Sequence, residues 1–268
     1  MSEAPVTEER VALTVDDHVA VVTLTRADKH NALDLPMLDG IIAASERLRS
    51  ERGVRAVVLH GDGKSFCSGL DFPAVAAAGG LEALTSILDE PPPNYFQRAA
   101  HNWLQLPMPV IAAIHGSCFG GGLQIALAAD IRFATADARL SVMEAKWGII
   151  PDMSITRTLP RLVGIDIAKE MTYTARTVNG EEAHRLGLVT HLSDDPLRDA
   201  LELAREIAGR SPDAVRRAKR LFNEGWTGPT EETLALEAKL QGELIGTPNQ
   251  LAALSAGLTK QEPKFTDP

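Results

Sequence analysis

The sequence predicts an α/β fold followed by a helical region. Up to about residue 210, short apolar segments of strand length alternate with longer segments in which apolar residues recur every three or four positions. After Ser211-Pro212 only the helical pattern remains. Turns rich in glycine separate several strands from the segments that follow them. We therefore expect an α/β core over residues 1–210 and a C-terminal helical subdomain over residues 211–268.

Strands are expected where short apolar runs are bounded by glycine, proline or aspartate. The first two runs meet at Asp16-Asp17, which is typical of a hairpin. The expected strands are Val11–Val15, His18–Thr25, Arg55–His60, Val110–Ile114, Ile131–Ala134, Leu140–Met143 and Val189–Leu192. Residues 1–9, which precede them, are interpreted as a polar tail.

Helices are expected where the apolar spacing fits one face of a helix. The first has a clear start signal, because Asp34 can cap it and Pro36 suits its first turn. The expected helices are Pro36–Glu51, Tyr95–Leu106, Ser154–Val163, Ile165–Thr174, Gly180–Leu186, Pro196–Arg210, Asp213–Glu224, Thr230–Ile245 and Gln250–Lys260. Residues 72–105 have the weakest pattern, and we interpret them as a wall or lid of a site.

The composition and the spacing of particular residue types argue against several classes of binding partner. A net charge of −9 at pH 7, without a basic run, argues against nucleic acid. Cys67 and Cys118 form no CxxC pair and the histidines have no ligand spacing, so we expect neither a disulfide framework nor a metal site. The N-terminus lacks an apolar signal segment, and no apolar run approaches the roughly 20 residues of a membrane span. We expect a cytoplasmic protein without a membrane partner.

Three consecutive glycines, Gly120, Gly121 and Gly122, lie where an apolar strand gives way to an apolar helix-like segment. Because glycine has no Cβ, a ligand can approach this backbone closely. The first N–H groups of a helix have no acceptor within it, and the helix dipole favours negative charge there. The glycines therefore predict a place for an anion, or for an oxygen that becomes an anion during a reaction.

A second glycine-containing loop, Gly61–Asp71, also follows an expected strand. Its Gly63-Lys64-Ser65 resembles the end of a P-loop, but the earlier glycine of that motif is replaced by Val58. No GxGxxG follows a strand, so a dinucleotide site is unsupported as well. Taken alone, this loop would be interpreted as an ordinary connection between a strand and a helix. Together the two loops supply the two converging N–H donors that an oxyanion hole requires.

Several ordered motifs resemble the crotonase superfamily, the enoyl-CoA hydratase/isomerase group. They are Asn31-Ala-Leu33, Phe66-Cys-Ser-Gly-Leu-Asp71, Ile114-His-Gly-Ser-Cys-Phe-Gly-Gly-Gly122 and Ala129-Asp-Ile-Arg-Phe133. The resemblance runs from about Val11 to the C-terminus, where Leu254–Phe265 resembles the last helix of that family. It implies a crotonase-like spiral of ββα units, acyl-CoA thioesters as substrates, and no cofactor beyond the CoA of the substrate.

The resemblance also implies the site residues. The oxyanion hole falls on the backbone N–H groups of Leu70 and Gly121. Where hydratases of the family carry their first glutamate this chain has Gln124, an amide that does not exchange protons at neutral pH but can orient a water or a thioester. The second glutamate corresponds to Glu144. Asp152 lies eight residues later, a spacing that resembles the Δ3,5-Δ2,4-dienoyl-CoA isomerase branch, although that branch carries Asp at the position of Gln124.

Glu144 and Asp152 can also be interpreted as residues without a catalytic role. Without the resemblance, Glu144 would be a surface carboxylate at a helix start and Asp152 an N-cap. With the implied oxyanion hole beside them, we expect both in the active site as the groups that move protons. The residues expected to contact CoA are Arg26, Lys29, Ser68, Asp71, Lys260 and Lys264. The aromatic residues Tyr95, Trp103 and Trp147 either line the acyl pocket or pack in the core.

These residues lead to a hypothesis of function. We expect an isomerase that shifts acyl-CoA double bonds through a thioester enolate or dienolate. One alternative is an enoyl-CoA hydratase with Glu144 as its single catalytic glutamate, and the other is a non-catalytic acyl-CoA binder. The apolar faces of the C-terminal helices, together with the resemblance, predict a homotrimer or a dimer of trimers.

Overall fold

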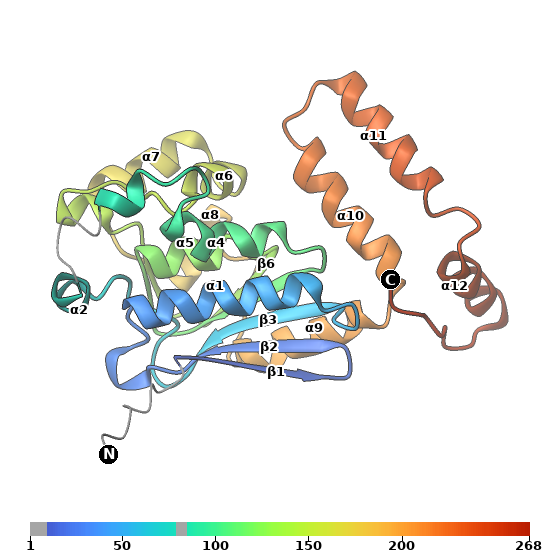
Figure 1. The fold of residues 1–268 in the computed structure, drawn as a ribbon, viewed down its shortest axis with the longest axis horizontal. Helices are drawn as coiled ribbons and strands as arrows, with labels where there is room; N and C mark the ends of the chain where they lie inside the picture. The colour runs from blue at the N-terminus through green and yellow to red at the C-terminus, as the bar shows by residue number, and fades with distance from the viewer. Residues whose placement is uncertain (1–9, 79–84) are drawn as a thin grey trace, which may run out of the picture.

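The computed structural model of the chain describes residues 10–78 and 85–268 (Figure 1). The expected tail over residues 1–9, and residues 79–84 of the expected wall, lie outside the described residues. The main sheet has the order β1-β2-β3-β4-β6-β9. Its strands are β1 (Val11–Asp16), β2 (Val19–Leu24), β3 (Ala56–Gly61), β4 (Val110–Ile114), β6 (Ile131–Ala134) and β9 (His191–Leu192). The first pair is antiparallel and every later pair is parallel.

A second, smaller sheet has the order β5-β7-β8. Its strands are β5 (Ser117–Phe119), β7 (Arg139–Ser141) and β8 (Val178–Asn179). Neither β5 nor β8 was predicted, because strands of three and two residues carry no readable alternation. Single bridges pair Leu33 with Leu70 and Cys67 with Cys118. The first joins the segment after β2 to the loop after β3, and the second brings that loop alongside β5, directly before the three glycines.

The helices follow the predicted order. They are α1 (Leu35–Ser50), α2 (Phe72–Ala77), α4 (Tyr95–Gln105), α5 (Gly121–Leu127), α6 (Ile155–Thr158), α7 (Ile165–Thr174), α8 (Gly180–Leu186), α9 (Pro196–Ala208), α10 (Pro212–Gly225), α11 (Thr230–Gly242) and α12 (Pro248–Thr259). The N-cap prediction for Asp34 is confirmed, because its carboxylate accepts a 2.9 Å hydrogen bond from the Met37 N–H. The single helix expected over Ser154–Val163 is wrong. α6 ends at Thr158 and a 3-10 turn follows, since Pro160 has no N–H for the α-helical pattern.

Both faces of the main sheet are covered. On one face, Val58, Ile111 and Ala113 pack against α9, whose alanines at positions 200, 204 and 208 form a flat stripe. On the other face, Val57 and Leu59 belong to the larger core that includes side chains of α1, α4 and α5. Adjacent residues of one strand thus face different helices, which is the pattern of a parallel sheet buried on both sides. The predicted α/β class with a helical C-terminal region is confirmed.

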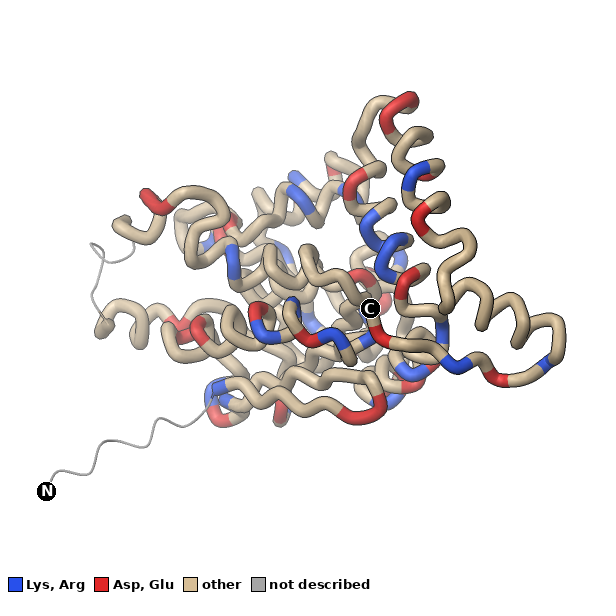
Figure 2. Tube along the Cα trace, turned by 45° about the vertical axis from the view of Figure 1, so that its right-hand side comes forward, with Lys and Arg blue, Asp and Glu red and all other residues tan. Residues whose placement is uncertain are grey.

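The C-terminal helices α10, α11 and α12 lie to one side of the sheet (Figure 1). Basic positions gather along α10, as Figure 2 shows. Three of these basic side chains attach the helix to neighbouring segments of the chain. Arg216 donates to the backbone carbonyl of Val54 at 3.1 Å, Arg217 pairs with Glu243 at 3.1 Å, and Lys219 pairs with Asp130 at 2.8 Å.

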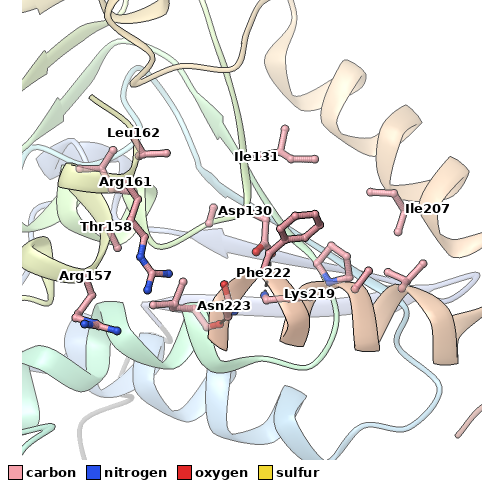
Figure 3. Close-up of a pocket in the computed structure, with 16 residues that line it drawn as sticks. Asp130, Ile131, Arg157, Thr158, Arg161, Leu162, Ile207, Lys219, Phe222 and Asn223 are labelled. Atoms are coloured by element: carbon pink, nitrogen blue, oxygen red, sulfur yellow. Dashed lines mark hydrogen bonds and ion pairs between the residues drawn. The ribbon is translucent and has the colours of Figure 1, made fainter. Parts of the chain in front are cut away.

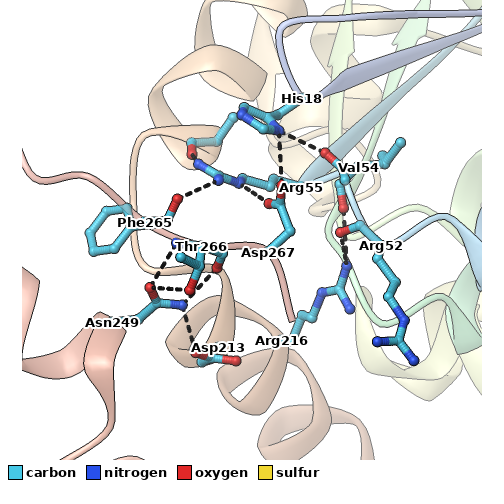
Figure 4. Close-up of polar contacts among 12 residues, drawn as sticks. His18, Arg52, Val54, Arg55, Asp213, Arg216, Asn249, Phe265, Thr266 and Asp267 are labelled. Atoms are coloured by element: carbon cyan, nitrogen blue, oxygen red, sulfur yellow. Dashed lines mark hydrogen bonds and ion pairs between the residues drawn. The ribbon is translucent and has the colours of Figure 1, made fainter.

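The chain then returns to the sheet and is held there by a polar cluster (Figure 4). Arg55 donates to the Asp267 carboxylate at 2.7 Å and to the Phe265 carbonyl at 3.2 Å. The Asn249 amide donates to Asp213 at 2.7 Å and to the carbonyl of Thr266 at 2.9 Å. These contacts connect α12 with α10 and with the start of β3. In the described part of the chain, no helix combines the length and apolar character needed to cross a membrane.

Candidate active site

A cavity of about 510 Å³ opens where the two glycine loops meet. Six of the predicted site residues line it: Ser68, Leu70, Gly121, Gln124, Glu144 and Asp152. They come from the loop after β3, from α5 and from the segment after β7. Segments separated by up to about eighty positions in the sequence therefore contribute to one cavity, as the resemblance implied.

The backbone at Leu70 presents its N–H away from the neighbouring strand. In its parallel bridge with Leu33, the Leu33 N–H donates to the Gly69 carbonyl at 2.8 Å, and the Asp71 N–H donates to the Leu33 carbonyl at 3.0 Å. In a parallel pairing of this kind, the N–H of the residue between those two partners points to the opposite side. Since Leu70 lines the cavity, this geometry suits its predicted role as an oxyanion donor.

The second predicted donor lies at the first position of α5. Gly121 is the first residue of that helix, and the first intrahelical bond is donated by Gln124 to the Gly120 carbonyl at 3.0 Å. The N–H of Gly121 therefore has no helical acceptor. A Cβ on Gly121 would lie 2.8 Å from the Met153 sulfur, and Gly120 has a positive φ of 52°. Both positions thus require glycine, one for space and one for backbone conformation.

Glu144 is buried, with 7% of its surface exposed, at the first position of the 3-10 turn η2 (Glu144–Trp147). The interpretation of Glu144 as a surface carboxylate is therefore wrong. Its Oε1 accepts a 2.7 Å hydrogen bond from the Gln124 amide. Its Oε2 is buried and has no hydrogen-bond partner among the described residues. Burial raises the pKa of the Glu144 carboxyl, the Gln124 hydrogen bond opposes that effect, and the charge of Asp152 adds to it.

Asp152 is partly buried and lines the same cavity. The N-cap interpretation of Asp152 is wrong, because Ser154 holds the cap position of α6 and no side chain caps that helix. Burial also raises the pKa of the Asp152 carboxyl. Two carboxyls that each resist ionisation, and that repel each other when both are charged, are suited to hold different protonation states.

Gln124 is almost fully buried, with 1% of its surface exposed. Its Nε2 donates to Glu144, and its Oε1 accepts a 2.8 Å hydrogen bond from the Met153 N–H. Sequence reasoning missed Met153, whose N–H holds Gln124 and whose side chain lies against Gly121. The only available signal was its position directly after Asp152.

The outer wall of the cavity is apolar. Phe72 and Trp147 form part of it, with ring centroids 4.9 Å apart, and Ile150 is 76% exposed at its edge. The interpretation of residues 72–105 as a wall is supported by Phe72, Thr85, Leu88 and Phe96, which all line the cavity. Of the three aromatic candidates only Trp147 lines it. Trp103 is fully buried in the core, and the Tyr95 hydroxyl donates to Asp39 at 2.8 Å.

The residues predicted to contact CoA are placed differently from one another. Ser68 lines the cavity and Lys29 is exposed. Arg26 is buried, and its guanidinium lies 2.8 Å from the Asp71 carboxylate and 3.4 Å from that of Asp34. Asp71 also accepts from the Ala74 N–H as the N-cap of α2. Arg26 and Asp71 thus already have partners within the protein, and their contact with CoA stays a prediction.

The C-terminal lysines are not part of the cavity of their own chain. Lys260 ends α12, and Lys264 lies in the segment that follows. Figure 1 places α12 at the opposite end of the molecule from α2, which borders the cavity. Neither lysine lines the cavity described above, and the expectation that Lys260 and Lys264 contact CoA stays a prediction.

A second cavity, of about 450 Å³, lies between α10 and the start of β6 (Figure 3). Its polar base is the pair formed by Lys219 and Asp130, and the Asp130 carboxylate also accepts from the Val110 N–H at 2.7 Å. Both charges are thus satisfied within the fold. None of the predicted site residues lines this cavity, so the candidate chemistry belongs to the cavity at the glycine loops.

The fold and the site together define a class of enzyme. An α/β core that brings the N–H groups of Leu70 and Gly121, the buried Glu144 and the partly buried Asp152 to one apolar cavity is suited to proton transfer beside a carbonyl. Among the described residues, no group of three or more histidine, cysteine or carboxylate side chains is arranged to hold a metal ion.

The chain belongs to the enoyl-CoA hydratase/isomerase family, whose model matches residues 14–268. It is 38% identical over 244 residues to the Bacillus subtilis protein YngF, which is named for that family, with 90% of this chain and 92% of the relative covered. It is 34% identical to a mitochondrial methylglutaconyl-CoA hydratase of Mus musculus, over 92% of this chain and 79% of the relative.

Solved structures agree with this assignment. The crystal structure of an enoyl-CoA hydratase from Bacillus anthracis superposes with a TM-score of 0.89 at 32% identity, covering 96% of this chain and 98% of that one. Membership of the family is therefore supported by sequence and by fold together, and the predicted crotonase-like fold is confirmed.

Proposed function

We propose that this enzyme is an acyl-CoA double-bond isomerase that works through a thioester enolate or dienolate. The observation that carries the proposal is the pair Glu144 and Asp152, two carboxyls with raised pKa that line one cavity with Leu70 and Gly121. Two carboxyls in different protonation states are what a proton shuttle along an acyl chain needs.

The proposed reaction keeps the formula of the substrate unchanged. With a 3,5-dienoyl-CoA, one carboxylate takes the proton from C2 and the electrons spread over the chain as a dienolate. The N–H groups of Leu70 and Gly121 donate to the thioester oxygen, which carries the charge, and each such donor contributes roughly 10²–10³ in rate. The other carboxyl delivers a proton to C6, which gives the conjugated 2,4-dienoyl-CoA. The two carboxyls thereby exchange protonation states.

The cavity lining supports an apolar acyl chain. Phe72, Leu88, Trp147, Ile149 and Ile150 line its outer part. No lysine or arginine is found among the described lining residues. A substrate with a second carboxylate, such as the name of the mouse relative indicates, would leave that charge without a partner. We therefore propose unsubstituted hydrocarbon acyl groups as the substrate class.

A second candidate function is hydration of a 2-enoyl-CoA with Glu144 as the single catalytic glutamate. The observation that favours it is the naming of relatives such as those from mouse and Bacillus anthracis as hydratases. The same oxyanion donors would serve this reaction, since it also passes through a thioester enolate.

One experiment separates these functions. The protein is incubated with 3,5-dienoyl-CoA and, separately, with 2-enoyl-CoA. Growth of conjugated dienoyl absorbance without addition of water to the enoyl ester supports the isomerase. Water addition at the greater rate would reject it in favour of the hydratase. Protection from thermal unfolding by acyl-CoA, without either reaction and without exchange of α-protons into D₂O, would identify a non-catalytic binder.

A further inference from the structure

The two predicted oxyanion donors are held by different means. The Gly121 N–H belongs to the first residue of α5, so the helix fixes its direction. The Leu70 N–H lies in the loop between β3 and α2. The residues on either side of it, Gly69 and Asp71, are bonded to Leu33 at 2.8 Å and 3.0 Å. The position of the Leu70 N–H therefore depends on how Leu33 and Asp71 are held.

One buried side chain contacts both sides of this bridge. Arg26 lies two positions after the end of β2 and is 8% exposed. Its Nη1 donates to the carbonyl of Ala32, the residue before Leu33, at 3.0 Å. The same nitrogen lies 2.8 Å from Oδ2 of Asp71, the residue after Leu70. A single guanidinium nitrogen thus connects the end of a main-sheet strand to both segments that orient the Leu70 N–H.

The Asp71 carboxylate is also held from its other side. Its Oδ1 accepts a 3.1 Å hydrogen bond from the Ala74 N–H, as the N-cap of α2. Burial by itself would raise the pKa of the Asp71 carboxyl, but the Ala74 N–H and the Arg26 guanidinium hold that pKa below its usual range. The carboxylate is therefore ionised at neutral pH, and its contact with Arg26 is a charge-assisted one with a preferred direction.

Stability by itself does not explain a buried ion pair at this place. Taking two charges out of water offsets most of the free energy that their attraction returns, so an apolar pair of similar volume is often equally stable. A buried ion pair does add a defined geometry. A donor on a loop needs such support, because a displacement of about 1 Å can lower a rate by roughly 10²-fold.

We propose that Arg26 is a positioning residue that holds the Leu70 N–H in place for the thioester oxygen, an inference that rests on the proposed function in taking Leu70 as an oxyanion donor. This role differs from the predicted contact of Arg26 with CoA, because the guanidinium contacts Ala32 and Asp71. Arg26 takes no part in proton transfer. Its effect is on how strongly the thioester carbonyl is polarised.

The decisive variant is the double substitution Arg26→Met with Asp71→Asn. The new amide can still accept from the Ala74 N–H, and the methionine replaces most of the arginine stem, so no single charge of the pair is left buried. Asp34, which lies 3.4 Å from Arg26, keeps its other partner Arg10 at 3.5 Å. We therefore expect the double variant to fold with a melting temperature close to that of the unaltered chain.

The first measurement is the carbonyl stretch of a bound saturated acyl-CoA, isotopically labelled at its thioester carbonyl, by infrared difference spectroscopy. This ester has no double bond, so the measurement does not depend on which reaction the enzyme catalyses. In the unaltered chain we expect a shift to lower frequency than in water, because two N–H groups donate to the oxygen. The double variant should lose about half of that shift, because one of the two donors is displaced.

The second measurement is kinetic. In the double variant, kcat for isomerisation should fall by about 10–10²-fold while KM stays within about threefold, because geometry rather than binding is lost. Arg26→Lys keeps the charge on a shorter side chain, so it should rescue in part, with a loss of about threefold to tenfold. Affinity for CoA without an acyl group should stay within about twofold in both variants. Weaker CoA binding with an unchanged carbonyl stretch would overturn the positioning role in favour of a CoA contact.

The matched control is the double substitution Lys219→Met with Asp130→Asn. Lys219 is likewise 8% exposed and lies 2.8 Å from the Asp130 carboxylate, which also accepts from the Val110 N–H. Neither residue lines the cavity at the glycine loops. We expect the carbonyl stretch, kcat and KM of this control to match those of the unaltered chain, because losing a buried pair elsewhere does not displace Leu70.

The outcomes separate two failures. If the unaltered chain does not isomerise 3,5-dienoyl-CoA but the double variant loses part of the carbonyl shift, the proposed function fails and the positioning role stands. If the unaltered chain isomerises and the folded double variant keeps the full shift and kcat, the role of Arg26 is overturned while the proposed function stands. If the double variant does not fold, Arg26→Lys decides. An unchanged stretch and kcat in that variant overturn the role, and a partial loss of both supports it.

Discussion

At the scale of single residues, the chemistry depends on how the fold treats a few polar groups. Glu144 is buried beside an amide, and Asp152 lies in the same cavity. Burial makes the ionised form of each less stable than it would be in water. This is unfavourable for stability and useful for catalysis, since a carboxyl with a raised pKa can serve as an acid or a base near neutral pH.

We predict that Glu144→Gln and Asp152→Asn each reduce isomerisation by roughly 10²–10⁴, the usual contribution of one general acid or base. The CoA-ester affinity should stay nearly unchanged, because neither change removes an oxyanion donor. Initial rates with 3,5-dienoyl-CoA and calorimetric titration with a non-reacting acyl-CoA measure the two quantities. Near-full activity of both variants would show that Glu144 and Asp152 do not move protons in the reaction.

The raised pKa of Glu144 has a consequence for stability. The folded protein holds this proton more tightly than the unfolded chain, so its stability contribution is present below the unfolded pKa and is lost as pH rises through the folded pKa. Glu144→Gln should therefore raise the melting temperature more at about pH 8 than at about pH 4. Thermal unfolding at both pH values provides the check. An equal effect at the two values would show that ionisation of Glu144 is not involved.

At the scale of elements, the site depends on turns that only glycine can form. Gly120 has φ of 52° and ψ of −123° just before α5, a conformation unfavourable for any residue with a Cβ. Its N–H donates to the Ser141 carbonyl at 3.0 Å, which joins the start of α5 to β7. The turn therefore positions Gly121 relative to the segment that carries Glu144.

We predict that Gly120→Ala lowers the free energy of unfolding by about 1–3 kcal/mol, the usual cost of a strained backbone conformation. Gly242→Ala is the matched control, because its added Cβ would meet no atom within 4 Å in α11. That control should be neutral or stabilising by up to about 1 kcal/mol. Urea unfolding measures both. Equal stability of the two variants would contradict the strain at Gly120.

At the scale of the whole molecule, the helices α10–α12 expose apolar side chains to solvent. The most exposed of them include Phe222 at 65%, Ile245 at 67% and Leu258 at 77%. Exposed apolar groups collected on one region are typical of an association surface. The polar cluster around Arg55 and Asp267 holds this region against the sheet and so presents it in one orientation.

We propose that residues 211–268 form an oligomerisation subdomain and predict a homotrimer or a dimer of trimers. Sedimentation equilibrium measures the mass. Leu258→Glu places a charge on the exposed face of α12 and should shift the protein toward smaller species, whereas Thr259→Glu beside it serves as a control for added charge. A monomeric mass of the unaltered chain would reject the proposal.

Much of this protein was determined by the sequence itself. Helix α7 and strand β4 begin and end where the local pattern predicts, and Asp34 caps α1 as expected. The glycines and the motif positions also led to Gln124, Glu144 and Asp152. These features are readable because periodicity, capping and turn chemistry depend on residues close together in the chain.

Only the tertiary structure decided how distant residues are paired. It placed Arg26 against Asp71 and Asp34, pairings that the sequence analysis did not predict. It joined Gln124 to Glu144 and to the Met153 N–H across 20 and 29 positions. A charge or an amide looks the same in the sequence whether its partner is solvent, ligand or another side chain. The partner is chosen by the packing of segments that the local pattern does not connect.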